Sequence, residues 1–596
     1  MFTTRPEIRG TFGVVASTHW LASAVGMRAL ERGGNAFDAA VASGFTLQVV
    51  EPHLNGPGGD LPALFYSKKT GKLQALCAQG PSPAAMTMEA IRGLGLDLVP
   101  GSGFLPAVVP GAFDGWLRML RDHGTMTLAE VLEPAIDYAI NGYPAVGRIA
   151  ATINTVKELF ETEWPTSAAI YLKNGEPPAP GSLFANPTMG ETYARIVREA
   201  EAGGGSREAV IDRARDIWYR GWVAEAIDAY FHAAPMMDVS GRRHLGLLTA
   251  DDLANWESHY EEPATYQWGR YTVAKCGPWS QGPSMLQQLA LLDGMGVGEM
   301  DPTGPDFVHS VVEAIKLAMA DREAFYGDPD FADVPMQTLL SSEYNAERRK
   351  LITGEASMDL RPGTIEGYLG SIDAALGVDV QLDPREMERM GIGEPTVSKS
   401  GAMKGDTVHI DVIDKDGNMF SATPSGGWLQ SSPIIPELGF CMGNRAQMFW
   451  LDERSPSALG PKRRPRTTLS PSFALRDGEP YMAFGTPGGD QQDQWQTLMF
   501  LHHAEHGMNL QESIDCPAFH SEHFPSSFWP RGRKPGKLVL EGRFPEATVK
   551  ELQRRGHDVQ VGEDWSEGRL SGAVKDGRML KAGANPRGMQ GYAIGR

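Results

Sequence analysis

The stretch from residue 406 to residue 423 constrains the chain most, because apolar and polar side chains alternate along it. The apolar positions are Val408, Ile410 and Val412, and the polar positions between them are Thr407, His409 and Asp411. Turn residues 414–418 can close a hairpin with a return strand over residues 419–423. Taken alone, the pattern predicts a half-buried strand that begins with an ordinary threonine.

A polar, glycine-bearing segment over residues 394–405 runs directly towards Thr407, which is the arrangement that a self-cleaving N-terminal nucleophile needs. Attack of the Thr407 hydroxyl on the carbonyl carbon of Asp406 would turn the amide into an ester, and water would then release Thr407 as a new N-terminus. The free α-amino group, with an ordinary pKa of about 7.7–8, would lie beside the hydroxyl that it must deprotonate. The same hydroxyl would then take an acyl group from a substrate amide and pass it to water or to an amine.

Residues 406–409 (Asp-Thr-Val-His) and 414–418 (Asp-Lys-Asp-Gly-Asn) resemble the start of the small subunit in the γ-glutamyltranspeptidase family of N-terminal-nucleophile hydrolases. Other motifs resemble that family in the same order along nearly the whole chain, at residues 33–40, 51–60, 109–111, 248–253, 309–322, 327–329, 464–471 and 485–489. The resemblance is closer to the acylase and amidohydrolase-like members. It implies an α/β (α+β) fold, the four-layer αββα sandwich of these hydrolases.

The resemblance also implies that the chain is made as one inactive piece and cut between Asp406 and Thr407. Residues 1–406 would form a large subunit and residues 407–596 a small catalytic subunit, and the two would stay associated as one αββα unit. Residues 358–406 would be an irregular arm that leads to the cleavage site, and this arm is longer than the resemblance predicts. The sequence leaves open whether the cleaved heterodimer forms a homo-oligomer.

The resemblance assigns four catalytic residues. Thr407 would be the nucleophile and, through its own amine, the general base, while Ser425 would be a second hydroxyl that steadies it. The backbone N–H groups of Gly488 and Gly489 would form the oxyanion hole. Without the resemblance, Ser425 is a turn serine before two glycines and the glycine pair is a simple turn.

The substrate-binding positions depart from the family pattern. Thr467 and Thr468 stand where the family usually has two serines, and Gln79 stands near the place of an arginine that clamps the α-carboxylate of a γ-glutamyl group. Gly427, Arg445 and Met448 stand where the family has an Asn, a Gln and an Asp that hold the α-ammonium. An arginine there would repel an ammonium and attract a carboxylate, so we expect an acyl group with a carboxylate and no α-amino group. The alternative for Arg445 is a surface cation in a loop.

Composition narrows the partners of this 596-residue chain. The excess of 74 acidic over 55 basic residues, a formal charge of −19, argues against nucleic acid and anionic membranes as partners. No apolar run reaches the roughly 18–20 residues of a membrane span, and no secretion signal is visible at the N-terminus. The four cysteines, Cys77, Cys276, Cys441 and Cys516, form no C-x-x-C pair. We therefore expect reduced thiols and a cytoplasmic location. The family resemblance implies a small-molecule amide as substrate.

No cofactor or metal is expected. Residues 502–506 match the H-x-x-E-H pattern of some zinc peptidases, but they lie where the family has an ordinary surface helix. His520 and His523 lie in an aromatic, proline-rich loop and are expected to pack and form hydrogen bonds rather than bind metal.

Several elements are predicted from periodicity and capping. Strands are expected at residues 13–17 and 271–275, a hairpin at 61–78, and helices at 21–31, 36–50, 128–141, 189–201, 218–233 and 307–325.

Two rival functions remain. The chain could keep true γ-glutamyl specificity, or it could be an uncleaved pseudoenzyme with a binding role, since Thr-Val replaces the more usual Thr-Thr.

Overall fold

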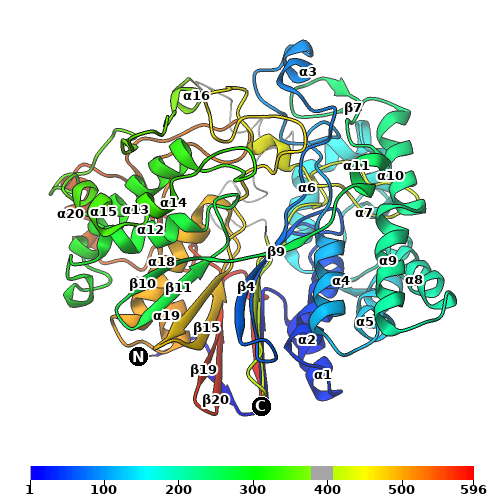
Figure 1. Cartoon of the computed structure of the whole chain (residues 1–596), viewed down its shortest axis with the longest axis horizontal. Coiled ribbons are helices and arrows are strands. Elements are labelled where there is room, and N and C mark those ends of the chain that lie inside the picture. The colour runs from blue at the N-terminus through cyan, green and yellow to red at the C-terminus, as the bar shows by residue number, and fades with distance from the viewer. Residues whose placement is uncertain (1, 378–406) are drawn as a thin grey trace.

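The computed structural model describes residues 2–377 and 407–596. Within these ranges the chain forms two seven-stranded antiparallel sheets flanked by helices (Figure 1). The predicted mixture of helix and sheet is therefore confirmed.

The first sheet has the order β21-β2-β12-β13-β3-β4-β9. Its strands are β21 (Tyr592–Gly595), β2 (Gly13–Ser17), β12 (Ile410–Asp414), β13 (Met419–Ala422), β3 (Leu61–Ser67), β4 (Lys72–Ala78) and β9 (His259–Glu261). The second has the order β1-β20-β19-β15-β14-β11-β10. Its strands are β1 (Ile8–Gly10), β20 (Met579–Ala584), β19 (Ser571–Asp576), β15 (Glu479–Gly485), β14 (Ser472–Arg476), β11 (Tyr271–Lys275) and β10 (Ala264–Trp268).

The β12–β13 hairpin lies at the centre of the first sheet. Strand β12 pairs with β2 on one side, where Ile410 faces Ser17, and with β13 on the other, where Ile410 faces Ala422. Strand β13 then pairs with β3. The hairpin that follows residue 407 is thus inserted between two strands from the N-terminal part of the chain.

Both faces of β12 are buried, so the prediction of a half-buried strand is wrong. Val408, Ile410 and Val412 pack into a core shared with the helices beside the first sheet. On the opposite face, Ile413 belongs to a second core that contains residues of both sheets. The polar face of β12 is covered because the second sheet packs against it.

Helices α1 (Trp20–Glu31), α2 (Ala36–Val50) and α4 (Ala112–His123) cover the outer face of the first sheet, on the right of Figure 1. Asn35 caps α2, because its side chain accepts from the N–H groups of Phe37 and Asp38 and the Asp38 carboxylate accepts from the Asn35 N–H. Helix α2 packs closely against α4. A Cβ atom on Gly44 would lie 2.3 Å from the indole of Trp116 in α4.

Helices α12 (Pro283–Leu292), α18 (Gln492–Ala504) and α19 (Leu510–Asp515) pack against the second sheet, and α13 (Pro305–Phe325) packs on α12. They lie on the left of Figure 1. A small sheet of β16 (Phe519–Ser521), β17 (Lys537–Leu540) and β18 (Asp558–Val561) joins this side, with α20 (Glu546–Arg554) between its last two strands. The apolar side chains of these elements form a third core.

The helical region on the right of Figure 1 includes α5 (Leu128–Asn141), at its predicted bounds, and α8 (Pro187–Ala202). The prediction of one continuous helix over residues 218–233 is wrong. The chain breaks it at Gly221, between α9 (Arg207–Tyr219) and α10 (Trp222–Ala233), where a Cβ atom would lie 2.8 Å from the Ile217 carbonyl oxygen.

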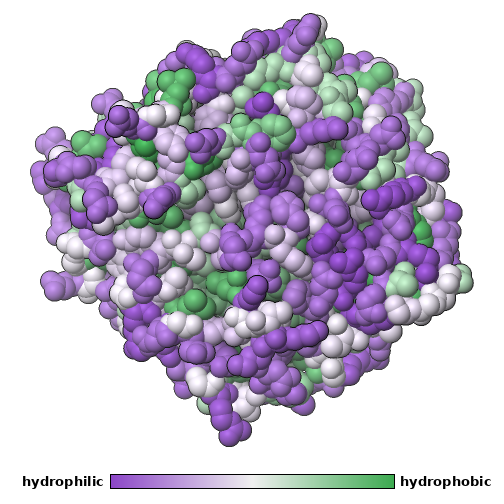
Figure 2. Space-filling view, in the orientation of Figure 1, coloured by the Kyte–Doolittle hydropathy of each residue, from purple (hydrophilic) through white to green (hydrophobic). Residues whose placement is uncertain are grey.

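The described part of the chain holds no helix that is both long and apolar enough to pass through a lipid bilayer. The face shown in Figure 2 is largely hydrophilic, with small apolar spots scattered between charged side chains. Exposed apolar residues distributed in this way are normal for a folded protein and mark no interface.

We expect the contact between Gly44 and Trp116 to limit what α2 tolerates. Gly44→Ala should lower the free energy of unfolding by about 1–3 kcal/mol, because the added methyl group overpacks a filled core. Chemical denaturation measures this change. Gly93→Ala is the control, since Gly93 is exposed in α3 (Met88–Gly93) and a Cβ atom there meets nothing within 4 Å. Equal effects of the two substitutions would contradict the packing argument.

Candidate active site

Thr407 lies shortly before β12, which begins at Ile410, and is only 1% exposed. It forms an antiparallel bridge with Ser425, and its Oγ1 donates a hydrogen bond of 3.1 Å to the Ser425 Oγ. The Val408 N–H donates to the Pro424 carbonyl at 3.2 Å, which fixes the backbone on either side of this bridge. The two predicted hydroxyls are therefore in contact. The other half of the predicted cleavage site, Asp406, lies outside the described residues.

Two glycine-bearing loops, residues 58–60 and residues 425–427, pack against each other at Ser425. Ser425 and Asp60 exchange backbone hydrogen bonds of 2.7 and 3.2 Å. A Cβ atom on Gly59 would lie 2.1 Å from the Ser425 carbonyl oxygen, and Gly427, with φ of +65°, packs on the Gly58 backbone. Backbone lies directly on backbone here, which explains why both loops need glycine.

Arg445 is not the surface cation of the alternative interpretation. It also has an acidic partner, which the sequence analysis did not identify. It starts a short 3-10 turn (Arg445–Met448), is 1% exposed, and its Nε donates to the Asp60 carboxylate at 2.6 Å. Burial raises the pKa of Asp60 to about 6, although the adjacent guanidinium acts to lower it. The acidic partner was missed because it lies 385 positions away along the chain. The only signal in the sequence was a carboxylate at the end of a glycine-rich loop.

Gln79, another substrate-binding candidate, is buried near the loop that carries Asp60. Gln79 directly follows β4, whose last register pair sets Ala78 opposite Leu61, the residue after Asp60. Within the described ranges, the Gln79 Oε1, Thr468 Oγ1 and Arg445 Nη2 atoms are buried without a hydrogen-bond partner. Buried polar atoms almost always have partners, so these three atoms are suited to contacting a polar ligand.

The predicted oxyanion loop follows β15. Gly488 and Gly489 have φ values of +129° and +50°, which favour glycine, and a Cβ atom on Gly488 would lie 2.3 Å from Trp495. The Gly489 carbonyl accepts from Gln281 Nε2 at 2.9 Å, and the Gln281 N–H donates to the Thr467 carbonyl at 2.8 Å. Gln281 thus ties the oxyanion loop to the threonine pair.

Arg322 supports Gln281. Its Nη1 donates to Gln281 Oε1 at 2.7 Å and to the carboxylate of Asp490, the residue after Gly489, at 2.5 Å. Arg322 is fully buried. The sequence analysis gave neither Gln281 nor Arg322 a role, because only the fold brings them to residues 488–490.

His409 joins the two groups of candidates. Its ring packs so closely on Gly485 that a Cβ atom there would lie 2.2 Å from it. One ring nitrogen lies 2.9 Å from the Thr423 hydroxyl and the other 2.9 Å from the Asp411 carboxylate. Because both nitrogens are engaged in the buried layer between the sheets, His409 holds the strand of the nucleophile against that of the oxyanion loop.

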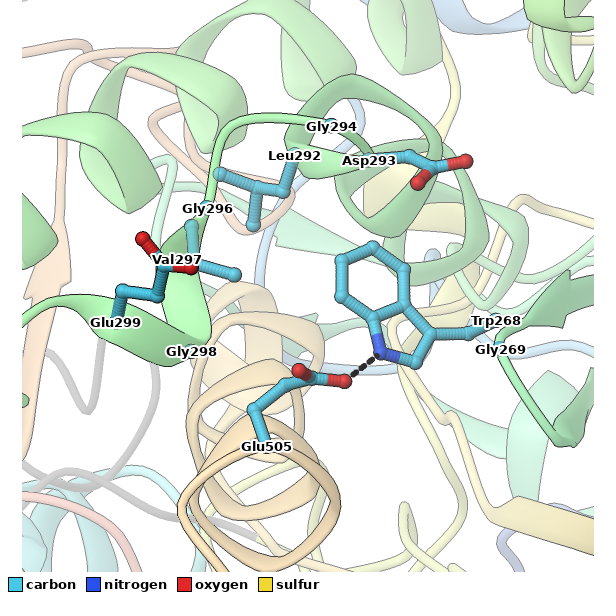
Figure 3. Close-up of a pocket in the computed structure, with 10 residues that line it drawn as sticks. All are labelled: Trp268, Gly269, Leu292, Asp293, Gly294, Gly296, Val297, Gly298, Glu299 and Glu505. Atoms are coloured by element: carbon cyan, nitrogen blue, oxygen red, sulfur yellow. Dashed lines mark hydrogen bonds between the residues drawn. The ribbon is translucent and has the colours of Figure 1, made fainter.

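The structure therefore gathers Thr407, Ser425, Gly427 and Arg445 around one pair of loops, and Gly488, Gly489 and Thr467 around another. A separate cavity of about 440 Å³ lies at the surface, lined by ten residues that include none of these (Figure 3). There the Trp268 indole donates to Glu505, the acidic member of the H-x-x-E-H pattern, at 2.7 Å. Helix α18 ends at Ala504, before that glutamate.

Two groups in the described chain have metal-ligand spacing, and each already contains a cation. Arg464 contacts both Cys77 and Glu261, next to His259. In the second group, His309, Glu313 and His557, the carboxylate accepts from Lys316 and Arg361. In both groups, at least one of the side chains that could bind a metal ion already forms a hydrogen bond with a positive side chain.

The Asp60–Arg445 pair generates a stability prediction. Asp60→Asn should lower the free energy of unfolding by about 3–5 kcal/mol, because it leaves a buried guanidinium without its counter-charge. Arg445→Met should also destabilise, while the double variant should lose less than the sum of the two. Chemical denaturation of the four proteins measures the coupling. Asp452→Asn, which breaks a pair with the exposed Arg454, should cost at most about 1 kcal/mol, and additive effects at 60 and 445 would refute a coupled buried pair.

Comparisons with known proteins place this geometry in a family. The family model described as gamma-glutamyltranspeptidase matches residues 22–595. The chain is 30% identical to the glutathione hydrolase-like YwrD proenzyme of Bacillus subtilis, with 99% of each chain covered, and 31% identical to the oxamate amidohydrolase proenzyme of Klebsiella pneumoniae, with 98% of each covered. The solved structure of LmbA2991HD is 54% identical, covers 100% of both chains and superposes with a TM-score of 0.93. The chain is an enzyme that belongs to the gamma-glutamyltranspeptidase family of hydrolases and transferases.

Proposed function

We propose that the chain cuts itself between Asp406 and Thr407 and then acts as an amidohydrolase or acyltransferase through an acyl-enzyme on Thr407. The observation that carries the proposal is the 3.1 Å hydrogen bond between the Thr407 and Ser425 hydroxyls at the head of a fully buried central strand. A threonine held there has a fixed orientation, and Ser425 lies in contact with the oxygen that must react.

The cleavage step rearranges one peptide bond. The Thr407 oxygen attacks the Asp406 carbonyl carbon, the C–N bond breaks, and the nitrogen becomes the α-amine of Thr407. Water then attacks the resulting ester, which returns the hydroxyl to Thr407 and leaves a carboxylate on Asp406. The hydroxyl and the new amine now belong to the same residue.

The catalytic cycle repeats this chemistry on a substrate amide. The α-amine accepts the hydroxyl proton as the oxygen attacks the substrate carbonyl, and that proton passes to the departing amine. The N–H groups of Gly488 and Gly489 are proposed to stabilise the oxyanion, in a loop that Gln281 and Arg322 hold in place. Water or another amine then takes the acyl group from Thr407.

We propose an acyl group that bears a carboxylate and no α-amino group. Gln79 replaces the arginine that would clamp an α-carboxylate, and the place of the family's acidic residue is taken by Met448, which is packed against Trp428 and Phe528. The amidohydrolase relative acts on oxamate, an amide whose acyl group carries a carboxylate. The alternative of a true γ-glutamyltransferase is favoured by one observation, the carboxylate of Asp60 beside Arg445, which could hold an ammonium.

We also propose that the two cut pieces stay together in a four-layer αββα arrangement. Both sheets contain strands from before and after residue 407, since the β12–β13 hairpin lies between β2 and β3, and the block β20-β19-β15-β14 lies between β1 and β11. Cleavage would leave all of these strand pairs intact. We retain a cytoplasmic location as a proposal.

Self-cleavage makes a direct prediction. Intact mass spectrometry of the purified protein should show two pieces with the masses of residues 1–406 and 407–596, whereas Thr407→Ala should remain one full-length chain, because it lacks the attacking oxygen. The wild type remaining uncut and inactive after long incubation would favour the uncleaved pseudoenzyme.

Substrate choice is tested separately. A glutaryl anilide should be turned over faster than the γ-glutamyl anilide, because no described residue at positions 79, 427 or 448 offers a charge to the amino-acid head group. Release of the aniline, followed by absorbance, gives kcat/KM for both compounds. A higher kcat/KM for the γ-glutamyl compound would overturn the argument about the acyl group and favour the transferase alternative.

A further inference from the structure

A buried ion pair joins the second sheet to the helix that follows the oxyanion loop. Lys275 ends β11, and Asp493 lies in the first turn of α18. Both side chains are fully buried, and the Lys275 Nζ lies 2.9 Å from the Asp493 carboxylate. Lys275 also donates to the Ser472 hydroxyl of β14 at 2.8 Å. Each charge is therefore compensated inside the protein, as burial requires.

This ion pair and its neighbours in α18 bind Ser470, which lies two residues after the threonine pair. The Ser470 hydroxyl donates to the Asp493 carboxylate at 2.7 Å, and the Ser470 carbonyl accepts from Lys275 Nζ at 3.1 Å. The Ser470 N–H donates to Gln492 Oε1 at 3.0 Å. Gln496 Nε2 donates to the Ser470 carbonyl at 2.9 Å. Every polar atom of Ser470 is thus bound by Lys275 or by the first two turns of α18.

The threonine pair is also held at its other end. The Thr467 N–H donates to the Trp279 carbonyl at 2.9 Å, and the Thr467 carbonyl accepts from the Gln281 N–H at 2.8 Å. The Gln281 side chain in turn binds the Gly489 carbonyl. The Thr468 hydroxyl lies between these two anchors, is buried, and makes no hydrogen bond within the described chain. The pair therefore combines a fixed backbone with a hydroxyl that is available to a ligand.

The same contacts connect the threonine pair to the oxyanion loop. The 3-10 turn Gly489–Gln491 runs directly into α18, which begins at Gln492. A shift of Ser470 relative to Asp493 would therefore move the threonine pair relative to the oxyanion glycines. Breaking a buried, hydrogen-bonded ion pair is costly, so this connection resists such a shift.

We propose that Lys275, Asp493 and Ser470 are positioning residues that hold the threonine pair in place relative to the oxyanion loop. Their role in turnover rests on the proposed function, because they act through groups that would contact the substrate. Catalysis depends on the exact placement of such groups, and oxyanion donors act mainly in the transition state. Loosening the connection should therefore lower kcat more than it changes KM.

Ser470→Ala tests the proposal while it leaves the ion pair in place. It should lower kcat about 10-fold for the anilide that the wild type turns over, with KM changed less than about 3-fold. Ser470→Thr keeps the hydroxyl and should retain more of kcat. Ser43→Ala is the matched control, because the Ser43 hydroxyl is also fully buried but donates to the Ala22 carbonyl of α1 at 2.8 Å. It removes one buried hydrogen bond far along the chain from these segments and should leave kcat unchanged.

Hydrogen–deuterium exchange followed by mass spectrometry tests the connection without any turnover. Peptides that cover residues 467–470 and 488–492 should exchange faster in Ser470→Ala than in the wild type, and at the wild-type rate in Ser43→Ala. If Ser470→Ala does not fold, as judged by thermal unfolding, Gln492→Met replaces it in both experiments. That substitution removes only the acceptor of the Ser470 N–H and no charge.

The possible outcomes separate the two proposals. Wild-type kcat in Ser470→Ala, or a loss of kcat that Ser43→Ala shares, overturns the positioning role even if the chain cuts itself and turns over anilides. In a chain that neither cuts itself nor turns over an anilide, faster exchange of both segments would support the connection and refute the proposed function. Unchanged exchange in such a chain would overturn both.

Discussion

The active site depends on the complete burial of β12 between a layer of helices and a second sheet. In such a place every polar group needs a partner, and the chain supplies partners from many distant segments. Asp411 accepts from the Ser421 and Ser571 hydroxyls and lies against His409, while His409 reaches Thr423. This network fixes the strand up to Thr407. The nucleophile is therefore oriented by the interior of the protein, and a loop at the surface is not required to hold it.

The same constraint explains the glycines around the site. Ser425 and the loop at Asp60 meet backbone to backbone, and Gly485 packs flat against His409. A side chain at these positions would push the nucleophile away from the second hydroxyl or from the oxyanion loop. Gln281, in the loop between β11 and α12, and Arg322, in α13, complete the arrangement, so the reacting groups are positioned from both halves of the fold.

Much of the fold could be predicted from the sequence, because periodicity and capping are local properties. The hairpin after residue 407, the helix capped by Asn35 and the glycine loops all lie at the positions that periodicity, capping and turn residues predict. The burial of β12 could not be predicted, since alternation of polar and apolar residues looks the same whether water or a second sheet covers the polar face. The break at Gly221 was missed for a similar reason, because helical periodicity continues on both sides of it.

The site was predictable where motifs are contiguous and unpredictable where charges pair across the chain. Contact between the Thr407 and Ser425 hydroxyls was expected from the resemblance, but the partner of Arg445 was not, because Asp60 comes from the other end of the sequence. The pairing of buried charges around the active site therefore had to be determined from the three-dimensional structure.

The central claim is that the Thr407 hydroxyl carries the acyl group during turnover. Rapid acid quench of the enzyme with a carboxylate-bearing acyl amide, followed by peptide mass spectrometry of the 407–596 fragment, tests it most directly. The account predicts that the acyl mass is found on the peptide that starts at Thr407 and is absent from the peptide that contains Ser425. Acylation of any residue other than Thr407, or turnover with no acylated peptide under conditions that trap esters, would contradict it.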